Sequence, residues 1–142
     1  MATEPQSFHL QTDPDARLAA AVGGAARFLA EAAGLETDAI FQLQSSVIAA
    51  CREAFEHLTG VHPHLDVTLT RFADRIEVAL SHAGEDSPAF GLDTIAGLAA
   101  HAAGKPGNTH VFAGIDRVQY ETRNGESVTR LTKYIRRVSP RI

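Results

Sequence analysis

The chain has 142 residues, the length of one globular domain, and a formal net charge of −4 at neutral pH. Hydrophobic residues make up 44% and charged residues 21%, which excludes the composition of a disordered chain. The mildly acidic balance argues against nucleic acid and anionic membranes as partners, and no apolar run approaches the ~20 residues of a membrane span. With no signal-peptide pattern at its start, we expect a single cytoplasmic domain over 1–142, with a core from about 8 to 136.

The chain begins with a predicted strand and a long helix. Residues 7–11 alternate apolar and polar side chains, as half-buried strands do. Asp13 is a candidate N-cap, and the proline after it suits the first position of a helix that runs to about residue 33 and stops at Gly34. The adjacent Gly23 and Gly24 lower helix stability, which close packing against a neighbouring element would explain.

A second helix is predicted from residue 37 or 38 to about 59–60, and its two sides differ. One side is apolar and includes Cys51, which is expected to be a small buried hydrophobe. The other side offers a polar strip, made of Gln42, Ser45, Ser46, Ala49, Arg52, Glu53, Glu56 and His57. This helix is therefore expected to bury about half its circumference and to present a polar strip on the rest.

Two antiparallel hairpins are predicted beyond the helices. Residues 65–72 and 75–80 alternate at period two around a tight turn, and a loop over 81–90 leads to a short helix over 92–103. After a breaker at 104–107 and a further helical turn over 108–114, the final hairpin joins 116–122 to 127–135. Its turn, Asn124-Gly125, is the usual signal for type I′.

This order predicts an α+β domain, built as a two-layer sandwich. Helices grouped with antiparallel hairpins favour a mixed, mostly antiparallel sheet covered by helices on one face. Two stretches then carry a resemblance: Val-Ile-Ala-Ala-Cys-Arg-Glu-Ala-Phe-Glu-His over 47–57, and Asp-Arg-Val-Gln-Tyr-Glu over 116–121. The chain resembles the histidine-kinase-like (GHKL, or Bergerat-fold) ATPase domains, and among them the anti-sigma-factor serine kinases, over nearly its whole length from Phe8 to Arg136.

The first stretch resembles the family's N box, in which side chains four residues apart share one helical face. The resemblance implies a glutamate as general base, an asparagine on Mg²⁺ and a histidine beside the nucleotide. Those positions hold Ala49, Glu53 and His57 here. Ala49 cannot take a proton, while the Glu53 carboxylate is a candidate Mg²⁺ ligand in place of the amide.

Two further motifs of the family are also altered. The resemblance implies an aspartate that reads adenine in an Asp-x-Gly motif, and here His82 stands before a retained Gly84. A neutral imidazole at His82 accepts one hydrogen bond, although an exposed loop histidine is the ordinary interpretation. The glycine-rich phosphate motif keeps Gly107, with Lys105 as a nearby positive charge. The nucleotide-binding candidates are therefore Glu53, His57, His82, Gly84, Lys105 and Gly107.

Two functions follow from the resemblance. In one, the chain is a degenerate kinase that regulates transcription by binding a sigma factor or an anti-anti-sigma protein with a sulphate-transporter-like (STAS) domain. In the other, it is an active serine kinase that uses ATP and Mg²⁺ to phosphorylate that partner, with catalysis by positioning and charge. A homodimer is compatible with the resemblance. The basic residues from 133 to 141 are either a solvated terminus or a docking site for an acidic partner.

Overall fold

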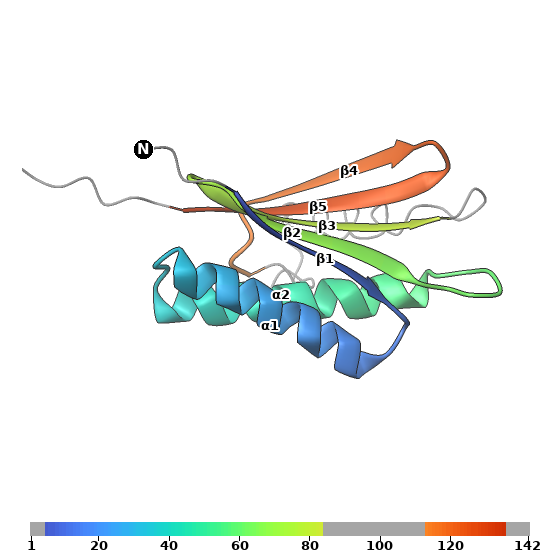
Figure 1. Cartoon of the computed structure of the whole chain (residues 1–142), viewed down its shortest axis with the longest axis horizontal. Helices are drawn as coiled ribbons and strands as arrows, with labels where there is room; N and C mark the ends of the chain where they lie inside the picture. Colours follow the sequence, from blue (N-terminus) through green and yellow to red (C-terminus); the bar gives the residue numbers. More distant parts are fainter. Residues whose placement is uncertain (1–4, 84–112, 136–142) are drawn as a thin grey trace, which may run out of the picture.

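The computed structural model describes residues 5–83 and 113–135 (Figure 1). Its elements, in chain order, are β1 (Gln6–Thr12), α1 (Ala16–Ala32), α2 (Thr37–Glu56), β2 (Leu65–Arg71), β3 (Arg75–Ala83), β4 (Arg117–Arg123) and β5 (Glu126–Tyr134). The predicted order of a strand, two helices and two hairpins is confirmed. The helix expected over 92–103, most of the turn over 108–114, and the sites at Gly84, Lys105 and Gly107 lie outside the described residues.

The five described strands form one sheet in the order β1-β2-β3-β5-β4. All four pairings are antiparallel, where a mixed sheet was expected. Both helices lie side by side against the same face of this sheet (Figure 1). The domain is therefore α+β with two layers, as the sequence indicates.

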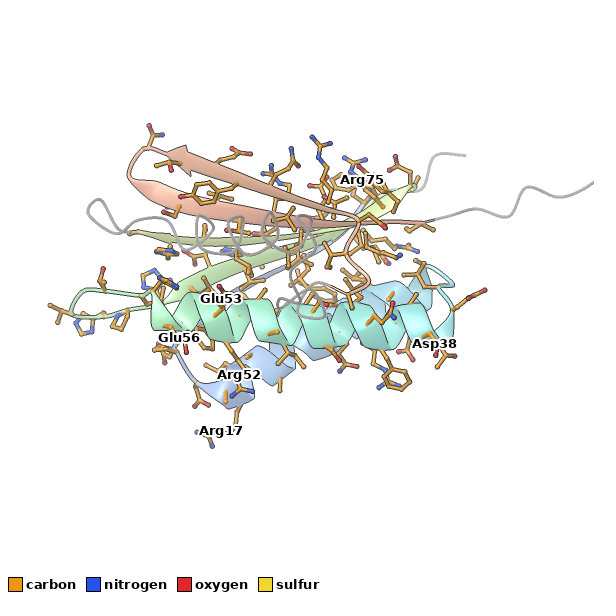
Figure 2. All side chains as sticks on the ribbon, turned by 180° about the vertical axis from the view of Figure 1, so that it is seen from behind. Arg17, Asp38, Arg52, Glu53, Glu56 and Arg75 are labelled. Atoms are coloured by element: carbon orange, nitrogen blue, oxygen red, sulfur yellow. The ribbon has the colours of Figure 1, made fainter. Side chains whose placement is uncertain are left out.

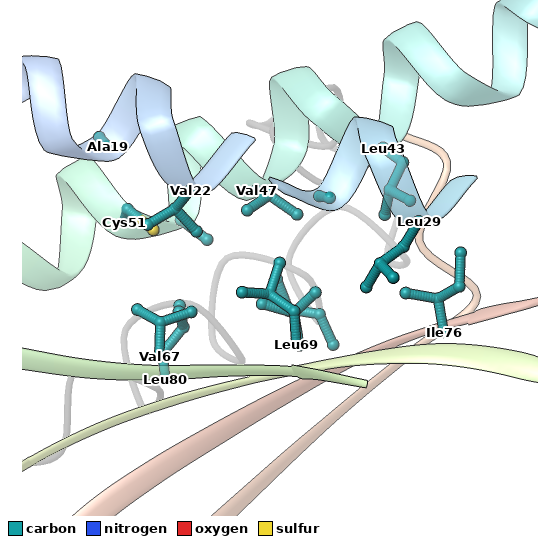
Figure 3. Packing of buried hydrophobic residues seen from close by; sticks show 14 of the residues in the cluster. Ala19, Val22, Leu29, Leu43, Val47, Cys51, Val67, Leu69, Ile76 and Leu80 are labelled. Atoms are coloured by element: carbon teal, nitrogen blue, oxygen red, sulfur yellow. The ribbon is translucent and has the colours of Figure 1, made fainter. Parts of the chain in front are cut away.

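The core lies between the helix layer and the sheet (Figure 3). Side chains from α1, α2, β2, β3 and β5 are almost fully excluded from solvent; the largest are Leu29, Leu43, Leu65, Leu69, Ile76, Leu80 and Leu131. Cys51 belongs to this cluster, and burial raises the pKa of its thiol to about 12. The interpretation of Cys51 as a buried hydrophobe is confirmed.

The two central glycines of α1 differ in their surroundings. A Cβ built on Gly23 would overlap Cγ1 of Ile48 and lie 2.7 Å from its Cδ1, so this glycine lets α1 and α2 approach closely. A Cβ built on Gly24 would meet nothing within 4 Å. Close packing therefore accounts for Gly23 and leaves Gly24 without a reason inside the described part of the chain.

Three element boundaries differ from the predicted ones by more than one residue. Helix α1 is capped by Asp15 and not by Asp13, because Asp15 has extended backbone angles and its side chain accepts a hydrogen bond from the Arg17 N–H at 2.8 Å. Helix α2 ends at Glu56, a few residues early. Strand β3 continues through Ala83, into the predicted loop, because β5 pairs with it as far as Ala83 and Glu126.

The turn of the final hairpin is as predicted. Asn124 and Gly125 have φ angles of 50° and 77°, and two consecutive positive φ values define a type I′ turn. Asp116 fixes the other end of the hairpin: its N–H donates to the Thr132 carbonyl at 2.8 Å, and its carboxylate accepts from the Tyr134 N–H at 2.7 Å. The closing hairpin is thus set by local signals at both ends.

Candidate functional site

The polar strip of α2 is divided between the sheet and the solvent. Arg52 and Glu56 are exposed and point away from the sheet, whereas Glu53 lies on the side of α2 that faces the sheet (Figure 2). Ala49, Glu53 and His57 are all half-buried. Their spacing of four residues stacks them along one side of the helix, as the sequence predicts.

His82 faces this helix from the sheet. It continues the inward-facing positions of β3 after Ile76, Val78 and Leu80, and its side chain is only 2% exposed. Burial lowers its pKa, and the charge of His57 lowers it further, so the two imidazoles lie within electrostatic reach of each other. The ordinary interpretation of His82 as an exposed loop residue is wrong, because the longer β3 carries it into the interior.

One ring nitrogen of His82 contacts the backbone. Its Nδ1 lies 3.3 Å from the Ala83 carbonyl oxygen, which accepts the Nδ1–H hydrogen bond. This contact favours the protonated ring and partly opposes the effect of burial on the pKa. Burial is the larger effect, so the folded protein favours the uncharged imidazole.

Two hydroxyl side chains of β5 extend the polar region across the sheet. Ser127 is paired with His82 and Thr129 with Leu80, and both hydroxyl residues are buried on the inward face. Among the described residues, Thr129 Oγ1 has no hydrogen-bond partner. The sequence does not reveal this arrangement, because the inward Ser127 and Thr129 are polar and the residue between them is an apolar valine. Only the pairing with β3 places the hydroxyls beside His82.

The opposite end of α2 is covered by the segment that leads into β4. Ser46, which is fully buried, donates a hydrogen bond from Oγ to the Ala113 carbonyl at 2.5 Å. Gly114 has a φ of 80°, and a Cβ there would lie 2.7 Å from Cβ of Gln42. A glycine is required at 114 both by its backbone angle and by its close approach to α2.

The structure thus brings Glu53, His57 and His82 to the interface of α2 and the sheet, at the end where the β4–β5 hairpin rises away from the helix layer toward its turn (Figure 1). Among the described residues, no three histidine, cysteine or acidic side chains are placed to hold a metal ion. The role of Glu53 as a Mg²⁺ ligand, with ATP bound nearby, stays a prediction.

Another polar group lies at the β1–β2 edge, apart from this region. The Asp66 carboxylate is 3.9 Å from His9 Nε2 and 3.8 Å from His64 Nε2. All three side chains are at least partly exposed, so ion pairs here contribute little to stability.

Comparison with known proteins gives no family. No protein-family model matches the chain, and no curated protein matches it. In the part of the chain that the structure describes, no helix has the length and apolarity needed to cross a bilayer.

Proposed function

We propose that this chain is a histidine-kinase-like regulatory domain of a bacterial partner-switching system, acting in the cytoplasm by binding a protein and not by phosphoryl transfer. Its partner is a sigma factor, a STAS-type anti-anti-sigma protein, or both. The single observation that carries the proposal is the position of Ala49. Ala49 is half-buried and lies one helical turn before Glu53, at the place where the family resemblance implies the general base.

The surroundings of Ala49 support a role without turnover. Glu53, one turn further along α2, adds negative charge where an amide would be expected beside a triphosphate. His82 is a buried, uncharged ring at the position of the adenine-reading aspartate. An imidazole that donates through Nδ1 to its own neighbouring carbonyl presents only one nitrogen to any ligand.

Nucleotide titration followed by calorimetry tests this proposal. ATP or ADP, with and without Mg²⁺, is titrated into the chain and into the variants Glu53→Ala and Glu56→Ala. The matched control is Glu56, an exposed glutamate three residues further along the same helix. We expect no Mg²⁺-dependent nucleotide binding that is lost in Glu53→Ala and kept in Glu56→Ala. We also expect a direct complex between the chain and a STAS-type protein encoded beside it. Phosphoserine on that protein after incubation with ATP and Mg²⁺ contradicts the proposal.

The second candidate is an active serine kinase, and the orientation of Glu53 favours it. A carboxylate on the sheet-facing side of α2 suits a hard, oxygen-preferring cation such as Mg²⁺. Under this alternative, Mg²⁺-dependent nucleotide binding in the micromolar range is lost in Glu53→Ala and kept in Glu56→Ala. Replacing Ala49 by glutamate would then raise the phosphorylation rate, because it supplies the missing base.

A further inference from the structure

Strand β4 forms the edge of the sheet on the side away from β1. Among the described strands only β5 pairs with β4, so its second edge has no described strand beside it. The hairpin of β4 and β5 rises away from the helix layer (Figure 1), and Thr122, close to its turn, is exposed. A sheet edge of this kind presents main-chain N–H and C=O groups with which an extended segment of another chain can pair.

The turn of this hairpin decides which main-chain groups of β4 point outward. In a hairpin closed by a two-residue turn, the residues that flank the turn, here Arg123 and Glu126, exchange both of their main-chain hydrogen bonds. Every second residue back from Arg123 therefore directs its N–H and C=O groups toward β5, and the residues between direct theirs to the open edge. The residues with outward main-chain groups are Val118, Tyr120 and Thr122.

The side chains of these three residues line the inner side of the edge, which faces the helix layer. Val118 packs against the hydrophobic core, and Tyr120 is half-buried. The Tyr120 hydroxyl lies 3.4 Å from Thr122 Oγ1. A strand that pairs with β4 would place its own inner side chains opposite Val118 and Tyr120, where β-branched or aromatic residues pack well in cross-strand pairs. The inner side of the edge therefore suits an apolar partner face.

The outer side of the edge carries an arginine that the described part of the chain does not pair. The Glu121 carboxylate accepts a hydrogen bond of 2.7 Å from Arg130, whose Nε is also 3.5 Å from the Glu77 carboxylate. Arg117, on the same side of β4, is exposed and forms no ion pair with the described residues. A carboxylate opposite Arg117 on a pairing strand would be attracted to this charge, and a lysine there would be repelled.

We propose that β4 is the docking edge for an extended segment of a partner protein, which adds to the sheet as a strand antiparallel to β4. The segment has β-branched or aromatic side chains on its inner face and an acidic side chain opposite Arg117. Main-chain hydrogen bonds to the open edge supply affinity, and the two side-chain rows supply specificity. The proposal goes beyond the regulatory role above, because it requires neither a nucleotide nor a particular family of partner.

A designed peptide tests the docking edge. The peptide Thr-Val-Thr-Val-Thr-Val-Glu, capped at both ends and fluorescently labelled, places its glutamate opposite Arg117 when it pairs antiparallel to β4. By fluorescence anisotropy we expect a dissociation constant of about 0.1–1 mM. Thr122→Pro should raise this constant roughly tenfold, because proline removes the outward N–H and leaves the pairing with β5 in place. Thr122→Val keeps the N–H and is the matched control, with an unchanged constant.

Charge exchange tests the register of the added strand and does not depend on the folding of Thr122→Pro. Replacing the glutamate of the peptide by lysine should weaken binding about two- to fivefold. Arg117→Glu should weaken binding of the glutamate peptide by a similar factor and restore binding of the lysine peptide. Arg52→Glu, at an exposed position of α2, is the control and should change neither.

Amide hydrogen exchange gives a readout at the backbone itself. The bound peptide should slow exchange at Val118, Tyr120 and Thr122 and leave Gln119 unchanged, because the Gln119 N–H already pairs with β5. No binding at millimolar peptide, binding insensitive to Thr122→Pro in a folded variant, a failed charge exchange, or protection of β1 amides instead each overturns the proposal. So does slow exchange of the three amides in the chain alone. It would mean that a second copy, if the protection rises with chain concentration, or otherwise a segment of the same chain occupies the edge.

Discussion

The inward face of the sheet has two parts that differ in chemistry although they belong to the same strands. Toward one end, apolar side chains such as those of Leu69 and Val78 are sealed under the two helices. Toward the other end, the same alternation delivers His82, Ser127 and Thr129. Burial alone therefore does not mark the core: one part holds the fold together, and the other places polar groups opposite α2.

The largest expected effect comes from the apolar part. Leu69→Ala removes a fully buried side chain between β2 and the helix layer, and we expect the free energy of unfolding to fall by about 2–5 kcal/mol. Urea denaturation followed by circular dichroism measures the change. A loss below about 1 kcal/mol would mean that this part of the interior is loosely packed, and the contrast between the two parts would fail.

The contact between the helices gives the next effect. In Gly23→Ala the new methyl group meets Ile48, whose branched side chain is stiff, and overpacking of this kind costs about 1–3 kcal/mol before about 1 kcal/mol of helix propensity is regained. In Gly24→Ala the methyl group meets no atom within 4 Å, so the free energy of unfolding should rise by up to about 1 kcal/mol. Thermal melts of the two variants should shift in opposite directions, and equal shifts would contradict the packing described here.

The polar part should respond to pH. Because the folded state lowers the pKa of His82, the unfolded chain binds the proton more readily, and stability is lost as pH falls below the ordinary histidine value of 6.5. His82→Gln should flatten the fall in the urea midpoint between about pH 7.5 and about pH 5, and His62→Gln, in an exposed loop, serves as its control. An unchanged pH profile in His82→Gln would mean that the buried imidazole does not contribute to acid sensitivity.

The smallest effect is expected at Thr129. Its Oγ1 is buried without a hydrogen-bond partner among the described residues, so Thr129→Val exchanges a desolvated hydroxyl for a methyl group of similar size. We expect a change in the free energy of unfolding between zero and about 1 kcal/mol in the stabilising direction, measured by urea denaturation. A clear loss of stability would show that the hydroxyl has a partner, and the polar part would then be structural.

Much of the fold was predictable because its signals are local. Period-two alternation identified the strands, and Asn124-Gly125 identified the final turn from two residues. The polar strip of α2 followed from helical periodicity alone. What failed depended on distant partners: His82 is buried because β5, which comes much later in the chain, extends β3, and no local pattern around residue 82 carries that information.

The candidate site was predictable only in part, for a related reason. The spacing of Ala49, Glu53 and His57 fixes their common side on α2, but not what faces them. Ser127 and Thr129 could not be assigned to the same region before the order of the strands was known. The two glycines of α1 teach the same lesson, since neighbours in sequence meet Ile48 in one case and open space in the other.

Cys51 gives the protein a built-in reporter of its own opening. It is the single cysteine of the chain, it has no exposed surface, and a thiol with a pKa of about 12 is almost entirely unreactive at neutral pH while the helices stay closed over it. Any thiol-specific reagent therefore modifies the chain only during excursions in which α2 separates from the sheet. The labelling rate therefore reports how often the buried thiol becomes accessible, without any substitution in the chain.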